Sequence, residues 1–258
     1  MMPWREQLET EGFVLLPGLF AAEEVRIAIA EWNEIQHQHA ANEAILASEN
    51  GPAYGARNLL QLWPRVMALA RPLCDPLREV LGDRAGVVRV LFFDKPPGHS
   101  WALPWHKDYN IAVVEHGVEG TFTKPTTKAG VPHVMAPFSL LTTMLTARVH
   151  LDDVTAQNGP LRVIPGSHRF YHTGEDETRA VVAIHCRAGD VLLMRPLLTH
   201  ASGNSQPDVG CHRRIVHLEC ATSHLLPDGY RWHQFEPLGE VERIGRNFET
   251  VASRAQNE

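Results

Sequence analysis

Two histidines and one aspartate are the residues of this sequence that best fit a metal centre. His106 stands two residues before Asp108, and in a β-strand residues at this spacing point to the same face. His200 follows an apolar stretch much further along the chain. Two imidazoles and one carboxylate bind iron on one face and leave its other coordination positions open for a co-substrate and dioxygen. The pattern therefore indicates the chemistry of non-haem iron oxygenases.

The same spacing of histidine and acid occurs at two further places. His150 precedes Asp152, and His217 precedes Glu219, each in surroundings typical of a strand. With 15 histidines in 258 residues, such pairs also arise by chance, so the spacing does not choose among the three. Something beyond the pair must select the metal ligands.

Composition and charge exclude several other classes of protein. Hydrophobic residues make up 44% of the chain, which is enough for a continuous core. A formal net charge of −6 disfavours binding to nucleic acid through bulk attraction to phosphate. Residues 1–6 lack the basic start of a signal peptide, and no apolar run reaches the roughly 18 residues of a membrane helix. The four cysteines form no C-x-x-C pair, so we expect reduced thiols and a soluble, cytoplasmic protein.

The elements that must position these residues form two groups. Residues 13–16 predict a short strand, residues 21–38 carry apolar side chains at helical spacing, and residues 60–81 predict a second helix interrupted by prolines. From residue 87 onward, short apolar runs alternate with turn residues, at 87–93, 140–151, 161–164, 181–185, 191–194 and 213–220. Strands without helices between them predict a mainly β fold with flanking helices, a barrel of the jelly-roll kind.

A single domain over residues 1–258 is the simplest partition, because no repeat or linker divides the chain. We expect N-terminal helices in about residues 1–86, packed on a β-barrel core in about residues 87–222. A polar C-terminal extension over residues 223–258 would wrap the surface. The stretch 108–137 is rich in Gly, Thr and Lys and too long for an ordinary connection, which predicts a functional loop or lid.

The segments around the candidate ligands match, in order and content, those of a known family. They begin at residues 12–18 and continue through 93–97, 103–108, 151–153, 158–168, 189–191, 195–202 and 213–214. These blocks resemble the phytanoyl-CoA dioxygenase family of Fe(II)/2-oxoglutarate oxygenases. The resemblance implies a double-stranded β-helix, a cupin-like jelly roll, in which His106, Asp108 and His200 hold Fe(II). It also implies that His150 and His217 are hydrogen-bonded core or surface histidines and not ligands.

A dicarboxylate co-substrate such as 2-oxoglutarate needs a cation for its distal carboxylate, and the planar arginine fork binds both oxygens. Arg213 and Arg214 are adjacent, so alternation along a strand lets only one of them face the barrel interior. The family motif corresponds to Arg213, which we expect to bind 2-oxoglutarate, with Arg214 as the alternative. The resemblance adds Ser202 as a contact to the co-substrate carboxylate and Leu91 as a hydrophobic contact.

Arg148 departs from the family, because many relatives carry Trp at that position. A buried arginine needs an anion, and here 2-oxoglutarate, an acidic substrate group or a salt bridge to an Asp or Glu would supply it. For the substrate, Arg57 lies where relatives often carry a cation that faces the site. Trp101, Trp105 and Tyr109 flank the proposed iron ligands and either contact substrate or pack beneath the lid. Lys95, beside two prolines, is either part of the site or a loop anchor.

The resemblance implies a dioxygenase that oxidises an unactivated C–H bond of a small molecule and releases succinate and CO2, with O2 as the second co-substrate. Asp108 favours hydroxylation, because halogenating relatives replace this carboxylate with a small residue. Lys124, Lys128 and His133 of the long loop suggest a substrate with a carboxylate or phosphate. Two alternatives are a barrel that binds 2-oxoglutarate or a metabolite without turnover, and a cupin-type metalloenzyme that does not use 2-oxoglutarate. The family name does not identify the substrate, and the sequence does not give the oligomeric state.

Overall fold

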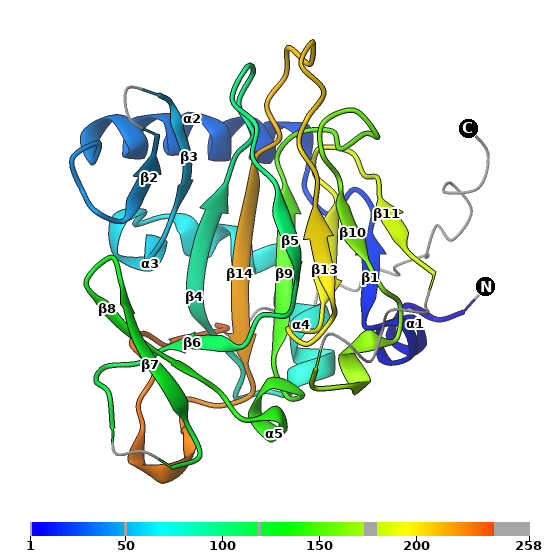
Figure 1. Ribbon diagram of the computed structural model, residues 1–258. Coiled ribbons are helices and arrows are strands. Elements are labelled where there is room, and N and C mark those ends of the chain that lie inside the picture. The colour runs from blue at the N-terminus through cyan, green and yellow to red at the C-terminus, as the bar shows by residue number, and fades with distance from the viewer. Residues whose placement is uncertain (1, 49–50, 118–119, 173–179, 240–258) are drawn as a thin grey trace.

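The structure is a computed structural model that describes residues 2–48, 51–117, 120–172 and 180–239. Its strands form three antiparallel sheets with the orders β1-β12-β9-β14-β4-β3-β2, β11-β10-β13-β5 and β6-β8-β7, and β15 pairs with β4 (Figure 1). The strands are β1 (Phe13–Leu16), β2 (Ile45–Ala47), β3 (Ala53–Ala56), β4 (Gly86–Phe93), β5 (Leu103–His106), β6 (Asn110–Ala112), β7 (Thr123–Lys128), β8 (Val131–Met135), β9 (Leu145–His150), β10 (Leu161–Val163), β11 (Val182–Ile184), β12 (Val191–Met194), β13 (His200–Ser202), β14 (Ile215–Ala221) and β15 (Glu236–Pro237). The helices are α1 (Trp4–Glu11), α2 (Ala22–Gln38), α3 (Leu59–Leu62), α4 (Cys74–Leu81) and α5 (Phe138–Leu141), with short 3₁₀ turns η1 (Val66–Leu73), η2 (Ser167–Arg169) and η4 (Pro227–Gly229).

The large sheet has one apolar face and one polar face. On β14, Val216 and Leu218 belong to the main apolar core, which also contains Trp32 of α2. Trp32 stacks on Phe92 of β4 with ring centroids 3.8 Å apart, and Figure 1 shows the helices behind this sheet. Because neighbouring strand residues point to opposite faces, His217 lies on the other side of β14. The helices thus close one face, and the polar face is left for chemistry.

The smaller sheet of β5, β13, β10 and β11 lies in front of the polar face of the large sheet (Figure 1). Two facing antiparallel sheets make the jelly roll that the sequence predicts. The sheets do not close into a barrel: within the residues that the structure describes, the strand ladders join strands of the same sheet only. The predicted fold is confirmed, but as an open sandwich of two sheets.

Several predicted elements differ in detail. Strand β1 and helix α2 coincide with the expected strand and helix, whereas the expected helix over 60–81 is broken into α3, η1 and α4, with Pro72 inside η1. The expected strand over 140–151 is wrong at its start, because residues 138–141 form α5 and the strand begins at Leu145. The N-terminal part is also not purely helical. Strands β2 and β3 extend the large sheet through pairs with β4, and such short strands give little periodic signal.

The stretch 108–137, which the sequence predicts as a functional loop or lid, contains the strands β6, β7 and β8, which form a sheet of their own. Ile111 and Val134 of this sheet are buried in a second apolar core together with Trp232. Trp232 belongs to the expected C-terminal extension, of which the described part packs onto the protein and residues 240–258 lie outside the described range. Within the described parts of the chain, no helix combines the length and apolar character needed to cross a membrane.

Candidate active site

The candidate metal ligands meet where β5 lies beside β13. His106 is the last residue of β5 and pairs in register with His200, the first residue of β13. On its other side His200 pairs with Val163 of β10, so its backbone is fixed inside the smaller sheet. The two imidazole centroids are 4.1 Å apart. Strand pairing therefore brings together two histidines that are far apart in the sequence.

Asp108 reaches the two imidazoles from a turn that follows β5, not from the strand itself. Its backbone N–H donates to the carbonyl of Pro196 at 2.9 Å. Between the two ligands, the buried ammonium of Lys107 donates to the carbonyls of Ser167 and Leu197 at 2.6 and 2.9 Å. These bonds turn the carboxylate of Asp108 inward. Its Oδ1 lies 3.8 Å from Nε2 of His106, and its Oδ2 lies 3.8 Å from Nε2 of His200.

Backbone carbonyls select the tautomer of both histidines. Nδ1 of His106 lies 2.8 Å from the carbonyl oxygen of Pro104, and Nδ1 of His200 lies 2.8 Å from that of Leu198. A carbonyl only accepts, so each Nδ1 carries the proton and each Nε2 keeps a lone pair. Burial lowers the pKa of His200 to about 4. Both lone pairs face Asp108, as ligand atoms should.

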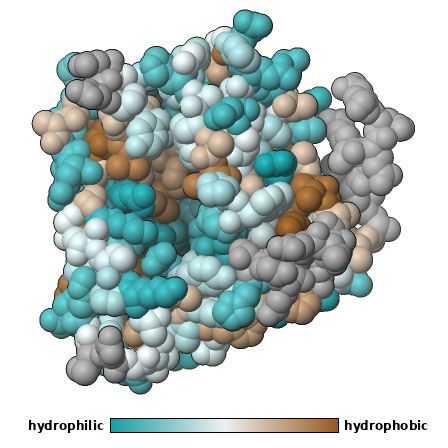
Figure 2. Space-filling model, in the orientation of Figure 1, coloured by the Kyte–Doolittle hydropathy of each residue, from teal (hydrophilic) through white to brown (hydrophobic). Residues whose placement is uncertain are grey.

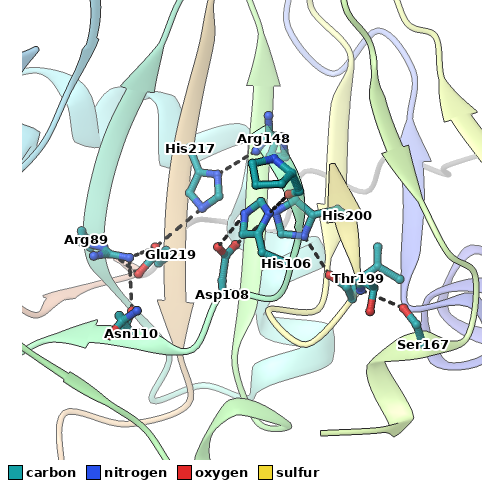
Figure 3. A network of polar contacts seen from close by, with 12 residues as sticks. Arg89, His106, Asp108, Asn110, Arg148, Ser167, Thr199, His200, His217 and Glu219 are labelled. Atoms are coloured by element: carbon teal, nitrogen blue, oxygen red, sulfur yellow. Dashed lines mark hydrogen bonds and ion pairs between the residues drawn. The ribbon is translucent and has the colours of Figure 1, made fainter. Parts of the chain in front are cut away.

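The three residues fit a divalent first-row metal ion (Figure 3). Their ligand atoms all lie within 4.8 Å of one another, and no other such group of His, Cys, Asp and Glu occurs in the described chain. Although burial would raise the pKa of Asp108, His200 and other neighbouring groups lower it to about 2, so the carboxyl is ionised. Its Oδ2 is buried and has no hydrogen-bond partner among the described residues. An orphaned carboxylate oxygen beside two imidazole lone pairs is the donor set of a facial triad.

The triad opens into a cavity that holds two buried arginines. Besides the triad, the cavity is lined by Phe93, Trp101, Leu103, Arg148, Leu161, Ser202, Arg213 and His217. Arg213 is 1% exposed, and its Nε and Nη1 have no hydrogen-bond partner in the described chain. Burial lowers the pKa of Arg213 to about 9 and that of Arg148 to about 10. Neither arginine forms a salt bridge to a described carboxylate, so the pair is suited to a small anion with more than one negative charge.

Arg214 points to the opposite side of its chain segment from Arg213. It forms a two-bond salt bridge to Asp152, with Nε to Oδ2 at 2.8 Å and Nη2 to Oδ1 at 2.7 Å. Asp152 is thus engaged by Arg214 and does not face His150. The latter ring is buried, places Nδ1 3.3 Å from the carbonyl of Asp190, and does not line the cavity. His150 and Asp152 therefore make separate structural contacts, each with a different partner.

His217, which the resemblance set aside, lines the cavity that contains the triad. Its neighbour at the same spacing, Glu219, is held in a buried salt bridge by both Nε and Nη2 of Arg89. A signal for His217 exists in the sequence. Strand alternation puts it on the same face as Arg213, so a cavity-facing Arg213 brings His217 with it.

Ser202 and Trp101 line the cavity, and Lys95 lies beside both. The ammonium of Lys95 contacts the carbonyl of Gly203, lies 3.4 Å from Oγ of Ser202, and sits 4.9 Å above the Trp101 ring. Burial, followed by the charge of Arg213, lowers the pKa of Lys95 to about 7. Lys95 is thus a third buried basic side chain near the cavity, and its contact with the Gly203 carbonyl also ties it to the segment after β13.

Four of the sequence candidates are not among the residues that line this cavity. Leu91 is buried on β4, and Arg57 is partly buried just after β3. Trp105 is 38% exposed. The hydroxyl of Tyr109 donates to the backbone carbonyl of Tyr171, which ties that ring to a neighbouring loop.

Comparison with known sequences gives matches over most of the chain. A family profile described as "Phytanoyl-CoA dioxygenase (PhyH)" matches residues 8–208. An ectoine dioxygenase from Sphingopyxis alaskensis is 27% identical over 175 residues, which are 66% of this chain and 50% of that protein. An ectoine dioxygenase from Bordetella bronchiseptica is 27% identical over 178 residues, 67% of this chain and 51% of that protein. The chain spans about half the length of these curated relatives.

Solved structures confirm the predicted fold. EctD from S. alaskensis with 2-oxoglutarate and 5-hydroxyectoine superposes with a TM-score of 0.66 at 24% identity, over 85% of this chain and 76% of that one. The carbocyclase SnoK from nogalamycin biosynthesis gives 0.63 at 16% identity, over 84% and 82% of the two chains. HygX from Streptomyces hygroscopicus with nickel and 2-oxoglutarate gives 0.56 at 20% identity, over 85% and 87%. At these identities the likeness establishes the fold alone.

Proposed function

Because the chain belongs to the phytanoyl-CoA dioxygenase family, we propose that it is an Fe(II)- and 2-oxoglutarate-dependent dioxygenase that hydroxylates an unactivated C–H bond of a small molecule, with release of succinate and CO2. The observation that carries the proposal is the cavity in which His106, Asp108 and His200 face two buried arginines without acidic partners. When bound, ferrous iron with 2-oxoglutarate and dioxygen supplies the oxidising chemistry. The protein's own residues bind and orient the reactants and keep water away.

Six polar residues of the cavity have a role in this proposal. His106, Asp108 and His200 would hold the metal through their unprotonated Nε2 atoms and the carboxylate. Arg213 would take the distal carboxylate of 2-oxoglutarate through its unpaired Nε and Nη1, with Ser202 beside it. Arg148 faces the same cavity and adds a second buried positive charge, which suits a doubly charged co-substrate.

We extend the proposal to the class of substrate, a small molecule with a carboxylate or phosphate. Figure 2 shows that this face of the molecule is hollowed near its centre, over β4 and β14, with hydrophilic side chains beside it. Burial lowers the pKa of Arg57, and the charge of Arg89 lowers it further. Burial also lowers the pKa of Lys128, followed by the charges of Arg57 and Arg89. Glu219 already pairs with Arg89. Among the described residues neither Arg57 nor Lys128 forms a salt bridge to a carboxylate, so we assign both to the binding of an anionic substrate, outside the set of residues that line the cavity.

Hydroxylation is the outcome that Asp108 supports, because a carboxylate at this position occupies the place that a halide needs. For comparison, the relatives described as ectoine dioxygenases differ from this chain at about three quarters of the aligned positions, so the substrate of this protein need not be theirs.

A cytoplasmic location also remains part of the proposal, since all four cysteines are free thiols.

An anaerobic titration tests the proposal. Fe(II) and then 2-oxoglutarate are added to the apoprotein, and the visible metal-to-ligand charge-transfer band is followed in wild type, Asp108→Ala and His150→Ala. We expect the band in wild type and in His150→Ala, and a lost or altered band in Asp108→Ala. Iron binding without a band in wild type would contradict the proposal and favour a cupin-type metalloenzyme. A band without succinate release from any of a panel of anionic small molecules under oxygen would favour a binding protein.

A further inference from the structure

His217 lies in the wall of the cavity, and its neighbour Arg148 sets its tautomer (Figure 3). The two residues stand directly opposite each other on β14 and β9. Nδ1 of His217 lies 3.1 Å from Nη1 of Arg148. A guanidinium donates and never accepts, so Nδ1 is the acceptor. Burial lowers the pKa of His217, which keeps the ring neutral, and its one proton therefore sits on Nε2.

The Nε2–H group of this tautomer has no hydrogen-bond partner in the described chain, although the side chain of His217 is only 4% exposed. The carboxylate of Glu219 lies 3.7 Å away, which is beyond hydrogen-bond distance, and Arg89 occupies both of its oxygens. A buried donor without a partner costs the desolvation of that group. Nε2 thus faces the charge of Glu219 only at a longer distance, and the hydrogen bond that the ring makes is the one from Arg148 to Nδ1.

The same contact is what holds Arg148 in place. Among the described residues, the hydrogen bond to His217 is the polar contact that fixes its guanidinium, while its Nε is buried and unpaired. The ring of Phe93 lies 6.0 Å from Cζ and supports one face of the guanidinium. Without the acceptor on His217, nothing polar in the described wall would keep the charge of Arg148 turned toward the cavity.

We propose that His217 is a positioning residue for co-substrate binding: its Nδ1 accepts a hydrogen bond from Arg148 and holds that guanidinium toward 2-oxoglutarate in the cavity. This inference rests on the proposed function, because it takes 2-oxoglutarate as the ligand. It assigns a role to the His-x-Glu pair that is neither metal binding nor simple packing. His217 acts through Arg148 and does not touch the reacting atoms.

Variants of His217 test this proposal, because the side-chain amides of Asn and Gln each reproduce one nitrogen of the histidine ring. His217→Asn places an acceptor near the position of Nδ1, whereas His217→Gln reaches only the position of Nε2, and His217→Leu removes both. We expect the Kd for 2-oxoglutarate, measured anaerobically in the Fe(II)-loaded protein, to rise about 10- to 100-fold in the Leu and Gln variants, the range for loss of a supporting group. The Asn variant should restore most of the affinity. His133→Leu, a buried histidine on β8 that does not line the cavity, is the matched control.

A double-mutant cycle shows whether His217 acts through Arg148. Arg148→Gln should weaken 2-oxoglutarate binding, and adding His217→Leu to it should cause no further loss, because the two changes remove one interaction. In the metal-free wild type, ¹⁵N NMR should show His217 protonated at Nε2 and bare at Nδ1, a readout that needs no ligand.

The outcomes separate this inference from the proposed function. Unchanged affinity in His217→Leu and His217→Gln, losses that add in the double mutant, or a proton on Nδ1 would each overturn the role of His217 while leaving the dioxygenase intact. If wild type itself does not bind 2-oxoglutarate, the proposed function fails and this inference fails with it. If His217→Leu does not fold, the comparison of Asn with Gln decides.

Discussion

His106 and His200 face each other across the β5–β13 pair, with their ring centroids 4.1 Å apart. A metal held by both imidazoles would join these two strands a second time, in addition to their backbone hydrogen bonds. Asp108 completes the site from a turn anchored on Pro196. Metal binding should therefore stabilise the folded state of the chain.

The first prediction is that a divalent metal raises the free energy of unfolding. A ligand that binds only the folded state stabilises it by about 2.7 kcal/mol at a free concentration 100 times its Kd. Thermal unfolding with Mn(II), which needs no anaerobic handling, should show this gain in wild type and in His150→Ala. In Asp108→Ala, where the unpaired carboxylate is gone, the gain should largely vanish. Equal stabilisation of Asp108→Ala would mean that the metal binds elsewhere.

The second prediction separates Arg213 from Arg214. Arg213→Lys should weaken 2-oxoglutarate binding by about tenfold or more, because an ammonium cannot reproduce the two-bond fork of a guanidinium. Arg214→Lys should leave the affinity unchanged, since Arg214 is engaged by Asp152 away from the cavity. Isothermal titration of the Mn(II)-loaded variants measures both. The reverse pattern, with the loss in Arg214→Lys, would refute the assignment.

The third prediction concerns pH and Lys95. The pKa of Lys95 is lowered to about 7 by burial and by the charge of Arg213. Below this pH the ammonium is charged and attracts the dianion, and above it the amine is neutral. Bound 2-oxoglutarate favours the charged form, so its affinity should fall as the pH rises through about 7. His200 and Asp108, with pKa values of about 4 and about 2, titrate well below this range.

Lys95→Met provides the control for this pH dependence. The variant should bind 2-oxoglutarate more weakly at pH 6 and should show a flat profile between about pH 6 and 8, below the pKa of about 9 of Arg213. A slope that persists in Lys95→Met would assign the titration to another group.

Part of the site could be predicted from sequence, and the reason differs from residue to residue. His106 and His200 stand in blocks whose order and content are specific, so they can be chosen without coordinates. Strand alternation makes Asp108 a candidate and the family resemblance selects it, yet β5 ends at His106. The inward turn of Asp108 depends on hydrogen bonds from Lys107 to the carbonyls of Ser167 and Leu197, which are distant in the sequence. His217 was set aside, because its value comes from a cross-strand partner, Arg148.

The fold, like the site, could be predicted from the sequence only in part. Helix α2 was found because its apolar residues recur at helical spacing over many residues, and strand β1 because turn residues bound a short apolar run. The sheet of β6, β7 and β8 was missed, since β7 is largely exposed and carries few apolar side chains. Such strands are specified by pairing with their neighbours, a long-range property that no local pattern contains.

The last prediction concerns the buried salt bridge behind the cavity. Arg89 and Glu219 pair through two hydrogen bonds, and Arg89 also donates to the carbonyl of Asn110 at 3.3 Å, which ties β4 to β6. Glu219→Gln would leave the guanidinium buried with no negative partner, and removing one member of such a pair costs about 3–5 kcal/mol. Urea unfolding should detect this loss.

A double variant identifies the cause of that loss. In Arg89→Leu/Glu219→Leu both charges are absent and apolar side chains fill the space, so much of the stability should return. Glu23→Gln, which breaks the exposed pair with Arg26, should change the stability too little to measure. If the double variant is no more stable than Glu219→Gln, the loss reflects packing of the Glu219 side chain and not the uncompensated charge of Arg89.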